Sequence, residues 1–177
     1  MRIALLATMV TFALDQASKL GVLYGLNLLD RGEVEVFPPY IVFHMAWNRG
    51  VNFGLFTGES QVTRWILIAI ALAISTWVWL WVRRDGAGRM AQIACGLLVG
   101  GALGNVVDRL AYGAVADFLN MSCCGIENPY SFNIADVAIF AGALALVLFS
   151  PRPASGPGGG ATRTKRSKVR KHTAKTP

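Results

Sequence analysis

The stretch WILIAIALAISTWVWLWV, residues 65–82, decides the fold of this chain, because it contains no charge and is bracketed by Arg64 and Arg83. A helix crosses the hydrocarbon core of a bilayer with roughly 17–25 mostly apolar residues. This run therefore predicts a membrane-spanning helix and not the core of a soluble domain.

Two further apolar runs have the same character. Residues 90–107 contain no charge, and residues 134–150 carry only Asp136, near their start. The whole chain of 177 residues is 54% hydrophobic and 15% charged, whereas soluble domains carry about 25% charged residues. Both runs are therefore predicted to span the membrane as well.

A fourth run, residues 3–23, differs because Asp15 and Lys19 lie in its second half. A cleaved signal peptide is the alternative here, since one positive charge precedes an apolar stretch. The two charged residues occupy the place of the small-residue cleavage site, which favours a retained helix. The predicted fold is thus an all-α membrane protein with four transmembrane helices.

Basic residues gather on one side of these predicted spans. Arg2, the short connection 83–89 and the C-terminal tail carry twelve of the seventeen Lys and Arg residues, and nine of the ten acids fall on the other side. Loops rich in Lys and Arg face the cytoplasm. We therefore expect both termini in the cytoplasm and two periplasmic loops, residues 24–63 and 109–133.

The periplasmic loops are patterned. Residues 32–44 alternate polar and apolar side chains before Pro38 and Pro39 and are then rich in β-branched residues, which predicts short strands or a hairpin. The second loop begins with an amphipathic segment, residues 115–119. We expect a small periplasmic β-rich subdomain within a membrane domain of residues 1–150.

The tail, residues 151–177, is predicted to be disordered and cytoplasmic, with a flexible Pro- and Gly-rich linker over residues 151–160. Eight of the seventeen basic residues lie in it, which leaves residues 1–150 with a net charge of −1. A basic nucleic-acid-binding fold is therefore excluded for that body. The tail is expected to bind anionic lipid headgroups, with ribosomal RNA as the alternative.

Cysteine and histidine are too scarce for several kinds of site. Cys95, Cys123 and Cys124 lack metal-ligand spacing and are too few for a disulfide framework. His172 lies in the tail, and His44 lies on an apolar strand, where a structural role is favoured over that of a catalytic base. We predict neither a metal nor a cofactor.

Four carboxylates map to the outer ends of predicted helices or to the segments leading into them; they are Asp15, Asp108, Asp117 and Asp136. Ionisable residues in or beside membrane spans are costly and are functional candidates. Two carboxylates that share a site retain one proton, so that one acts as a base toward water and the other polarises a carbonyl. Asp117 and Asp136, on the two arms of one outer loop, are the favoured pair.

Each candidate has a structural alternative. A lone Asp at a helix start, such as Asp136, is most often an N-cap or first-turn residue. Asp108 and Arg109 are more readily interpreted as a structural ion pair. Asp15 and Lys19 have the spacing to pair along one helix face.

Asn48, in WNRGVNFG (47–54), is either a site residue or a turn residue, because Asn and Gly tolerate positive φ angles. The third span carries glycines that leave a smooth face for close packing, namely Gly96, Gly100, Gly101 and Gly104. Spacing alone predicts a membrane protein with acids converging on its outer side, which is not yet a function.

Five short motifs follow one another in the order found in one bacterial family. They are DQASK (15–19), NRGVNFG (48–54), GNVVDR (104–109), VADF (115–118) and FNIAD (132–136). In these motifs the sequence resembles the bacterial lipoprotein signal peptidases, the type II signal peptidases, over roughly residues 1–150. GNVVDR and FNIAD together are specific. Val51 and Asn52 depart from the pattern, in which small residues are common.

The resemblance implies an aspartic endopeptidase of the inner membrane, which cleaves prolipoproteins immediately before a cysteine that carries diacylglycerol. By position, Asp117 and Asp136 match the catalytic dyad. Other matching residues line the site or hold substrate, namely Asn48, Asn105, Arg109 and Asn133. Three more are expected to support the site structurally, namely Asp15, Lys19 and Asp108.

The expected partners are diacylglyceryl-modified prolipoproteins and membrane lipids, with no nucleic acid. The chain is expected to be a monomer with its active site near the periplasmic face.

Two other classes of function compete with the peptidase interpretation. The first is a small transporter or proton channel, which would carry acids throughout the membrane depth, whereas the acids here gather at one face. A non-enzymatic assembly factor, bound to a cytoplasmic partner by its tail, tolerates loss of either Asp117 or Asp136.

Overall fold

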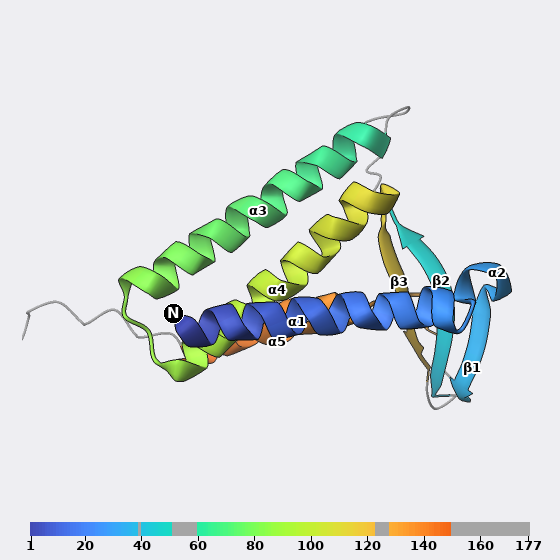
Figure 1. Cartoon of the computed structure of the whole chain (residues 1–177), viewed down its shortest axis with the longest axis horizontal. Coiled ribbons are helices and arrows are strands. Elements are labelled where there is room, and N and C mark those ends of the chain that lie inside the picture. The colour runs from blue at the N-terminus through green and yellow to red at the C-terminus, as the bar shows by residue number, and fades with distance from the viewer. Residues whose placement is uncertain (39, 51–59, 123–127, 150–177) are drawn as a thin grey trace, which may run out of the picture.

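The computed structural model describes residues 1–38, 40–50, 60–122 and 128–149. The predictions for Val51, Asn52, Cys123, Cys124 and the tail lie outside these residues. The elements are α1 (Arg2–Leu20), a π-helical turn η1 (Gly21–Gly25), α2 (Leu28–Arg31), β1 (Glu33–Phe37), β2 (Ile41–Asn48), α3 (Ser60–Arg84), α4 (Arg89–Tyr112), β3 (Val115–Met121) and α5 (Ile134–Phe149). Figure 1 shows the strands at one end of the helices, away from the N-terminus.

Three of the described helices are long and apolar enough to cross a membrane, namely Arg2–Gly25, Gln61–Arg84 and Arg89–Tyr112. They contain the first three predicted spans. The fourth, predicted over residues 134–150, corresponds to α5, whose 16 residues rise about 24 Å. The hydrocarbon core is about 30 Å thick. The structure therefore supports three spans by length among its described residues, and the fourth stays a prediction.

Helix α4 lies at the centre of the helices and contacts α1, α3 and α5. Of its most apolar stretch 67% is buried, compared with 22% for α3. Glycines permit this close approach. A Cβ on Gly100 would lie 2.6 Å from the carbonyl oxygen of Thr8 in α1, and a Cβ on Gly142 of α5 would lie 2.7 Å from backbone atoms of Ala94 and Leu98. The smooth glycine face predicted for this helix is thus covered by its neighbours.

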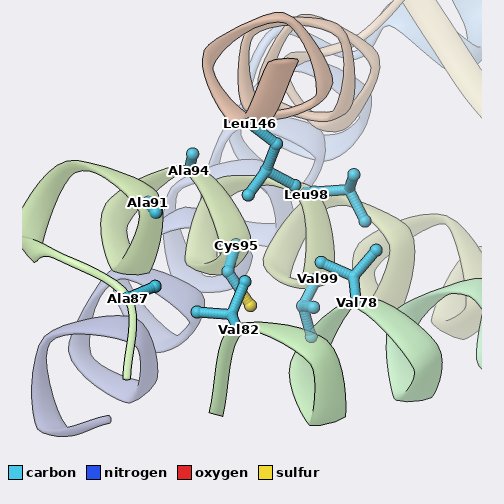
Figure 2. Packing of buried hydrophobic residues seen from close by; sticks show 9 residues of the cluster. All are labelled: Val78, Val82, Ala87, Ala91, Ala94, Cys95, Leu98, Val99 and Leu146. Carbon is cyan, nitrogen blue, oxygen red and sulfur yellow. The ribbon is translucent and has the colours of Figure 1, made fainter. Parts of the chain in front are cut away.

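An apolar cluster joins α3, α4 and α5 near the turn between α3 and α4 (Figure 2). Val78 and Val82 of α3 and Leu146 of α5 pack on the side chains that α4 contributes, which include Cys95. Cys95 is fully buried and forms no disulfide. It therefore serves as a small apolar packing residue in this cluster.

The sheet is antiparallel, with the strand order β1-β2-β3. Strands β1 and β2 correspond to the hairpin predicted around residues 32–44. Strand β3 comes from the second outer loop, where the sequence showed only an amphipathic segment. One face of the sheet packs on η1 and α2, where Phe43 and Phe118 form a cluster with Leu23 and Leu28. The subdomain therefore needs a strand from each of the two loops, since neither loop alone supplies this core.

Strand β3 is fixed at its start and in its middle. Gly113, with φ +79°, ends α4 in the left-handed conformation that favours glycine at a helix C-terminus, so that β3 follows at once. The backbone N–H groups of Phe118 and Leu119 both donate to the carbonyl of Phe132, at 3.1 and 2.8 Å. Such shared donation is the pattern of a β-bulge. It brings the residues that lead into α5 against the middle of β3.

Candidate active site

Asp117 lies in the middle of β3, and only 3% of it is exposed. Its Oδ1 accepts a hydrogen bond from Asn133 Nδ2 at 2.6 Å, and its Oδ2 accepts one from Asn48 Nδ2 at 3.0 Å. One donor comes from β2 and the other from the start of α5. The carboxyl group is therefore held in one orientation by two elements besides its own.

The surroundings of Asp117 change its acidity. Its pKa is raised to about 6, first by burial and then by the nearby charge of Asp136. The hydrogen bonds from Asn48 and Asn133 and the charge of Lys19 lower the pKa, but they do not offset the other two effects. Asp117 thus keeps a proton at a pH at which an ordinary aspartate has lost it.

Asp136 lies in the first turn of α5 and is half-buried. Its backbone N–H donates to Asn133 Oδ1 at 2.9 Å, and its own Oδ2 accepts the backbone N–H of Asn133 at 3.3 Å. This reciprocal arrangement is a capping box. Oδ1 of Asp136 accepts a hydrogen bond from Asn105 Nδ2 at 2.9 Å. The first-turn role left open by the sequence is therefore present, together with a contact to another candidate site residue.

Asn133 connects the two carboxylates. It is fully buried, and while its Nδ2 donates to Asp117, its Oδ1 accepts the backbone N–H of Asp136. Its Nδ2 also lies 3.3 Å from Asn105 Oδ1, which in turn accepts from Lys19 Nζ at 3.3 Å. One side chain thus holds both aspartates at fixed positions relative to each other.

A buried ion cluster lies behind this pair. Lys19 Nζ is 2.8 Å from Asp15 Oδ2 and 2.7 Å from Asp108 Oδ2. The other oxygen of Asp15 accepts the backbone N–H of Ala135 in α5 at 2.9 Å, and Oδ2 of Asp108 accepts that of Ala116 in β3 at 3.2 Å. The cluster therefore holds the backbone immediately before each of the two aspartates of the site.

Arg109 lies at the edge of the site. Its Nη1 donates to the carbonyl of Asn105 on the same helix at 3.3 Å, and its guanidinium interacts electrostatically with Asp117 and Asp136. Asp108, for which the sequence left open an ion pair with Arg109, pairs with Lys19 instead. Asp108 thus has Lys19 as its paired cation, and the guanidinium of Arg109 lies within electrostatic reach of Asp117 and Asp136.

Asn48 makes both a turn contact and a contact to Asp117. Its Oδ1 accepts the backbone N–H of Gly50 at 3.0 Å, where Gly50 has φ +93°. This is a local turn, and it orients the side chain so that Nδ2 faces Asp117. The turn therefore positions a donor for the site.

Gln16 joins this network, although its sequence pattern did not mark it as a site residue. Its Nε2 lies 3.1 Å from Asp15 Oδ2 and 3.2 Å from Asp108 Oδ1, and it therefore joins α1 to α4 beside the ion cluster. A glutamine on an apolar helix gives no signal of its own. The only hint was its position inside DQASK, directly after Asp15.

Known proteins are similar to this chain in both sequence and fold. The family model described as signal peptidase (SPase) II matches residues 7–151. The lipoprotein signal peptidase of Methylorubrum extorquens (strain PA1) is 46% identical over 153 residues, which cover 86% of this chain and 88% of that protein. The lipoprotein signal peptidase of Burkholderia ambifaria (strain MC40-6) is 34% identical over 140 residues, which cover 79% of this chain and 82% of that protein.

Two solved structures, each described as a bacterial membrane enzyme, have a similar fold. One gives a TM-score of 0.69 at 25% identity and covers 82% of this chain and 90% of its own. The other gives a TM-score of 0.67 at 26% identity and covers 82% and 85%. Because the family model and these relatives match most of its length, the chain belongs to the signal peptidase II family of lipoprotein-processing membrane proteases.

Proposed function

We propose that this chain is an aspartic endopeptidase that removes the signal peptide from diacylglyceryl-modified prolipoproteins by cleaving before the lipidated cysteine. Membership of the signal peptidase II family supports signal-peptide cleavage on prolipoproteins. The observation that carries the aspartic mechanism is the bridge made by Asn133, whose side chain bonds both Asp117 and the backbone of Asp136.

The two aspartates take different parts in this reaction. Asp117, whose raised pKa favours the protonated form, donates its proton to the oxygen of the scissile carbonyl. Asp136 acts as the base and takes a proton from a water molecule, whose oxygen bonds to the carbonyl carbon. Asp136 then passes this proton to the nitrogen of the cysteine as the C–N bond breaks, and Asp117 regains its own proton as the new carboxyl group forms.

The surrounding residues position these groups. Asn48 and Asn133 orient the carboxyl group of Asp117, and Asn105 orients that of Asp136. Arg109, at the edge of the pair, is suited to bind a carbonyl oxygen of the substrate backbone through its remaining N–H groups.

The proposed depth of the site in the membrane agrees with the expected depth of the bond to be cleaved. The sheet lies at the end of the helices opposite to the N-terminus and the basic α3–α4 turn (Figure 1). If that turn faces the cytoplasm, and α5 crosses as the fourth span, the aspartates lie at the periplasmic side of the inner membrane. The acyl chains on the cysteine stay in the bilayer, so the bond to be cleaved lies near the headgroups.

Cleavage of a diacylglyceryl-modified prolipoprotein peptide in detergent tests the proposal. We expect the wild-type protein to cleave before the lipidated cysteine, and Asp117→Asn and Asp136→Asn each to lose several orders of magnitude in rate, because the pair acts as one unit. Asp30→Asn is the matched control, since Asp30 is an exposed acid on α2. Unchanged cleavage by either variant of the pair would remove that residue from the mechanism.

A further inference from the structure

A groove of about 530 Å³ lies on the sheet, outside the hydrogen-bonded network of the two aspartates. Strands β1, β2 and β3 all contribute to it, with Glu33, Glu35, His44 and Asn120 among the lining residues. His44 Nδ1 lies 3.3 Å from Glu33 Oε2, and both side chains are 55% exposed. The described residues that line the groove include no Lys or Arg. The groove is therefore open and acidic, with apolar side chains such as Val42 between its polar ones.

The groove lies on the same face of the sheet as Asp117. Phe43 and Met45 of β2 pack against the core under the opposite face. Since side chains alternate along a strand, the intervening His44, and also Asn48, point away from that core. Asn48 donates to the carboxyl group of Asp117. One continuous face of β2 thus runs from the candidate active site to the groove.

The register of the strands places both acids on this face. Glu33 pairs with His44, Glu35 pairs with Val42, and Val42 pairs with Asn120 on the other side. Residues that pair across strands share a face of the sheet. The carboxylates therefore form the far wall of the groove, on the strand most distant from β3.

The distance along β2 sets which part of a bound peptide would reach the groove. Ala46 of β2 pairs with Asp117, and from Ala46 the strand runs two residues to His44 and four to Val42, or about 7–13 Å at ~3.3 Å per residue. An extended peptide has the same rise per residue. The groove therefore lies about two to four residues from the scissile bond.

We propose that this groove binds the segment that follows the lipidated cysteine, and that Glu33 and Glu35 favour Lys or Arg about two to four residues after the scissile bond. This inference rests on the proposed function. The apolar signal peptide does not fit an acidic groove, because its side chains would lose contact with the hydrocarbon core. The segment after the cysteine is extended and polar as it enters the periplasm, and its cations complement the two carboxylates.

The test compares three diacylglyceryl-modified peptides that carry Lys, Gln or Glu at the third residue after the scissile bond. At low salt we expect kcat/KM for the Lys peptide to exceed that for the Glu peptide about tenfold, since each exposed charge pair contributes up to about fivefold. In the double variant Glu33→Gln/Glu35→Gln this ratio falls to less than about twofold, and high salt reduces it in the wild type.

Two controls accompany these measurements. We expect the ratio to be preserved in Asp30→Asn, because Asp30 is an exposed acid outside the groove. We expect the ratio to disappear when the charge on the peptide is moved to its twelfth residue. Because each ratio is taken within one enzyme, a change in overall turnover does not affect it.

The outcomes separate the two proposals. Equal cleavage of the three peptides by the wild type, or a preference that survives in the double variant, overturns the assignment of the groove and leaves the peptidase function intact. Failure of the folded wild type to cleave even the Gln peptide overturns the proposed function itself.

Discussion

Asp117 connects the geometry of the site to the pH dependence of the reaction. Its pKa is raised to about 6, chiefly by burial, and the proposed mechanism requires its proton. We predict that kcat/KM falls as the pH rises through about 6, because Asp117 loses the proton that the proposed reaction requires. An ordinary aspartate would give this limb near pH 4. A pH–rate profile with the modified peptide measures the apparent values, which belong to the pair.

Asn48 offers a second test of the protonation of Asp117. Its hydrogen bond favours the ionised form of Asp117 and lowers the pKa of that carboxyl. We predict that Asn48→Ala shifts the falling limb to higher pH, in addition to slowing cleavage. A limb that stays in place or moves to lower pH would contradict the hydrogen bond as the cause.

Lys19 is the residue on which the buried ion cluster depends. It is 4% exposed and lies between two buried carboxylates. Lys19→Met leaves both of them without their cation, and the loss of one partner from a buried ion pair costs about 3–5 kcal/mol of unfolding free energy. We predict a clear loss of thermal stability in detergent. Arg31→Met, which removes an exposed cation on α2, should leave the melting temperature unchanged.

At the scale of elements, the contact between α1 and α4 is set by glycine. The Cβ of an alanine at position 100 would meet the Thr8 carbonyl oxygen and the Thr11 side chain. We predict that Gly100→Ala destabilises the fold by about 1–3 kcal/mol, because the helices must separate.

Gly21→Ala is the matched control for this packing. Position 21 has helical angles, φ −63° and ψ −42°, and a Cβ there meets nothing within 4 Å. Its thermal stability in detergent should equal or exceed that of the wild type, because alanine favours a helix over glycine by about 1 kcal/mol. Equal melting temperatures for the two alanine variants would show that close packing at position 100 does not limit stability.

Helix α5 shows how one element depends on others. Its first turn is capped by its own Asn133 and also by Asp15, which reaches Ala135 from α1. Capping from another helix fixes where α5 starts, and hence where Asp136 lies. The sequence predicted a helix here from its apolar run, but the carboxylate that accepts the hydrogen bond of Ala135 lies 120 residues away in the chain.

At the scale of the whole molecule, we expect the basic tail to be separable from the part of the chain that carries the candidate site. The residues of the candidate site all fall within residues 15–136, whereas eight of the seventeen basic residues lie after residue 150. We predict that deletion of residues 152–177 leaves turnover in detergent within about twofold and weakens binding to anionic vesicles, by roughly 1 kcal/mol per basic residue near the surface. A large loss of turnover in detergent would place the tail in the catalytic reaction.

The sequence by itself determined the helices, because apolar runs and bracketing charges are local properties that a bilayer imposes on any chain. It also singled out Asp117 and Asp136, since carboxylates beside apolar spans are rare, and the motifs around them resemble one family. The strand nature of residues 115–121 was not evident, because strand pairing depends on partners elsewhere in the chain.

Only the tertiary structure decided how these residues meet. It showed that Asn133 bonds to both aspartates, that Asp108 pairs with Lys19 and not with Arg109, and that Gln16 joins two helices. These contacts join segments up to 92 residues apart, and nothing in the local pattern encodes them. The physical reason is that a buried polar group must find partners wherever the packed helices and strands bring them within hydrogen-bonding distance.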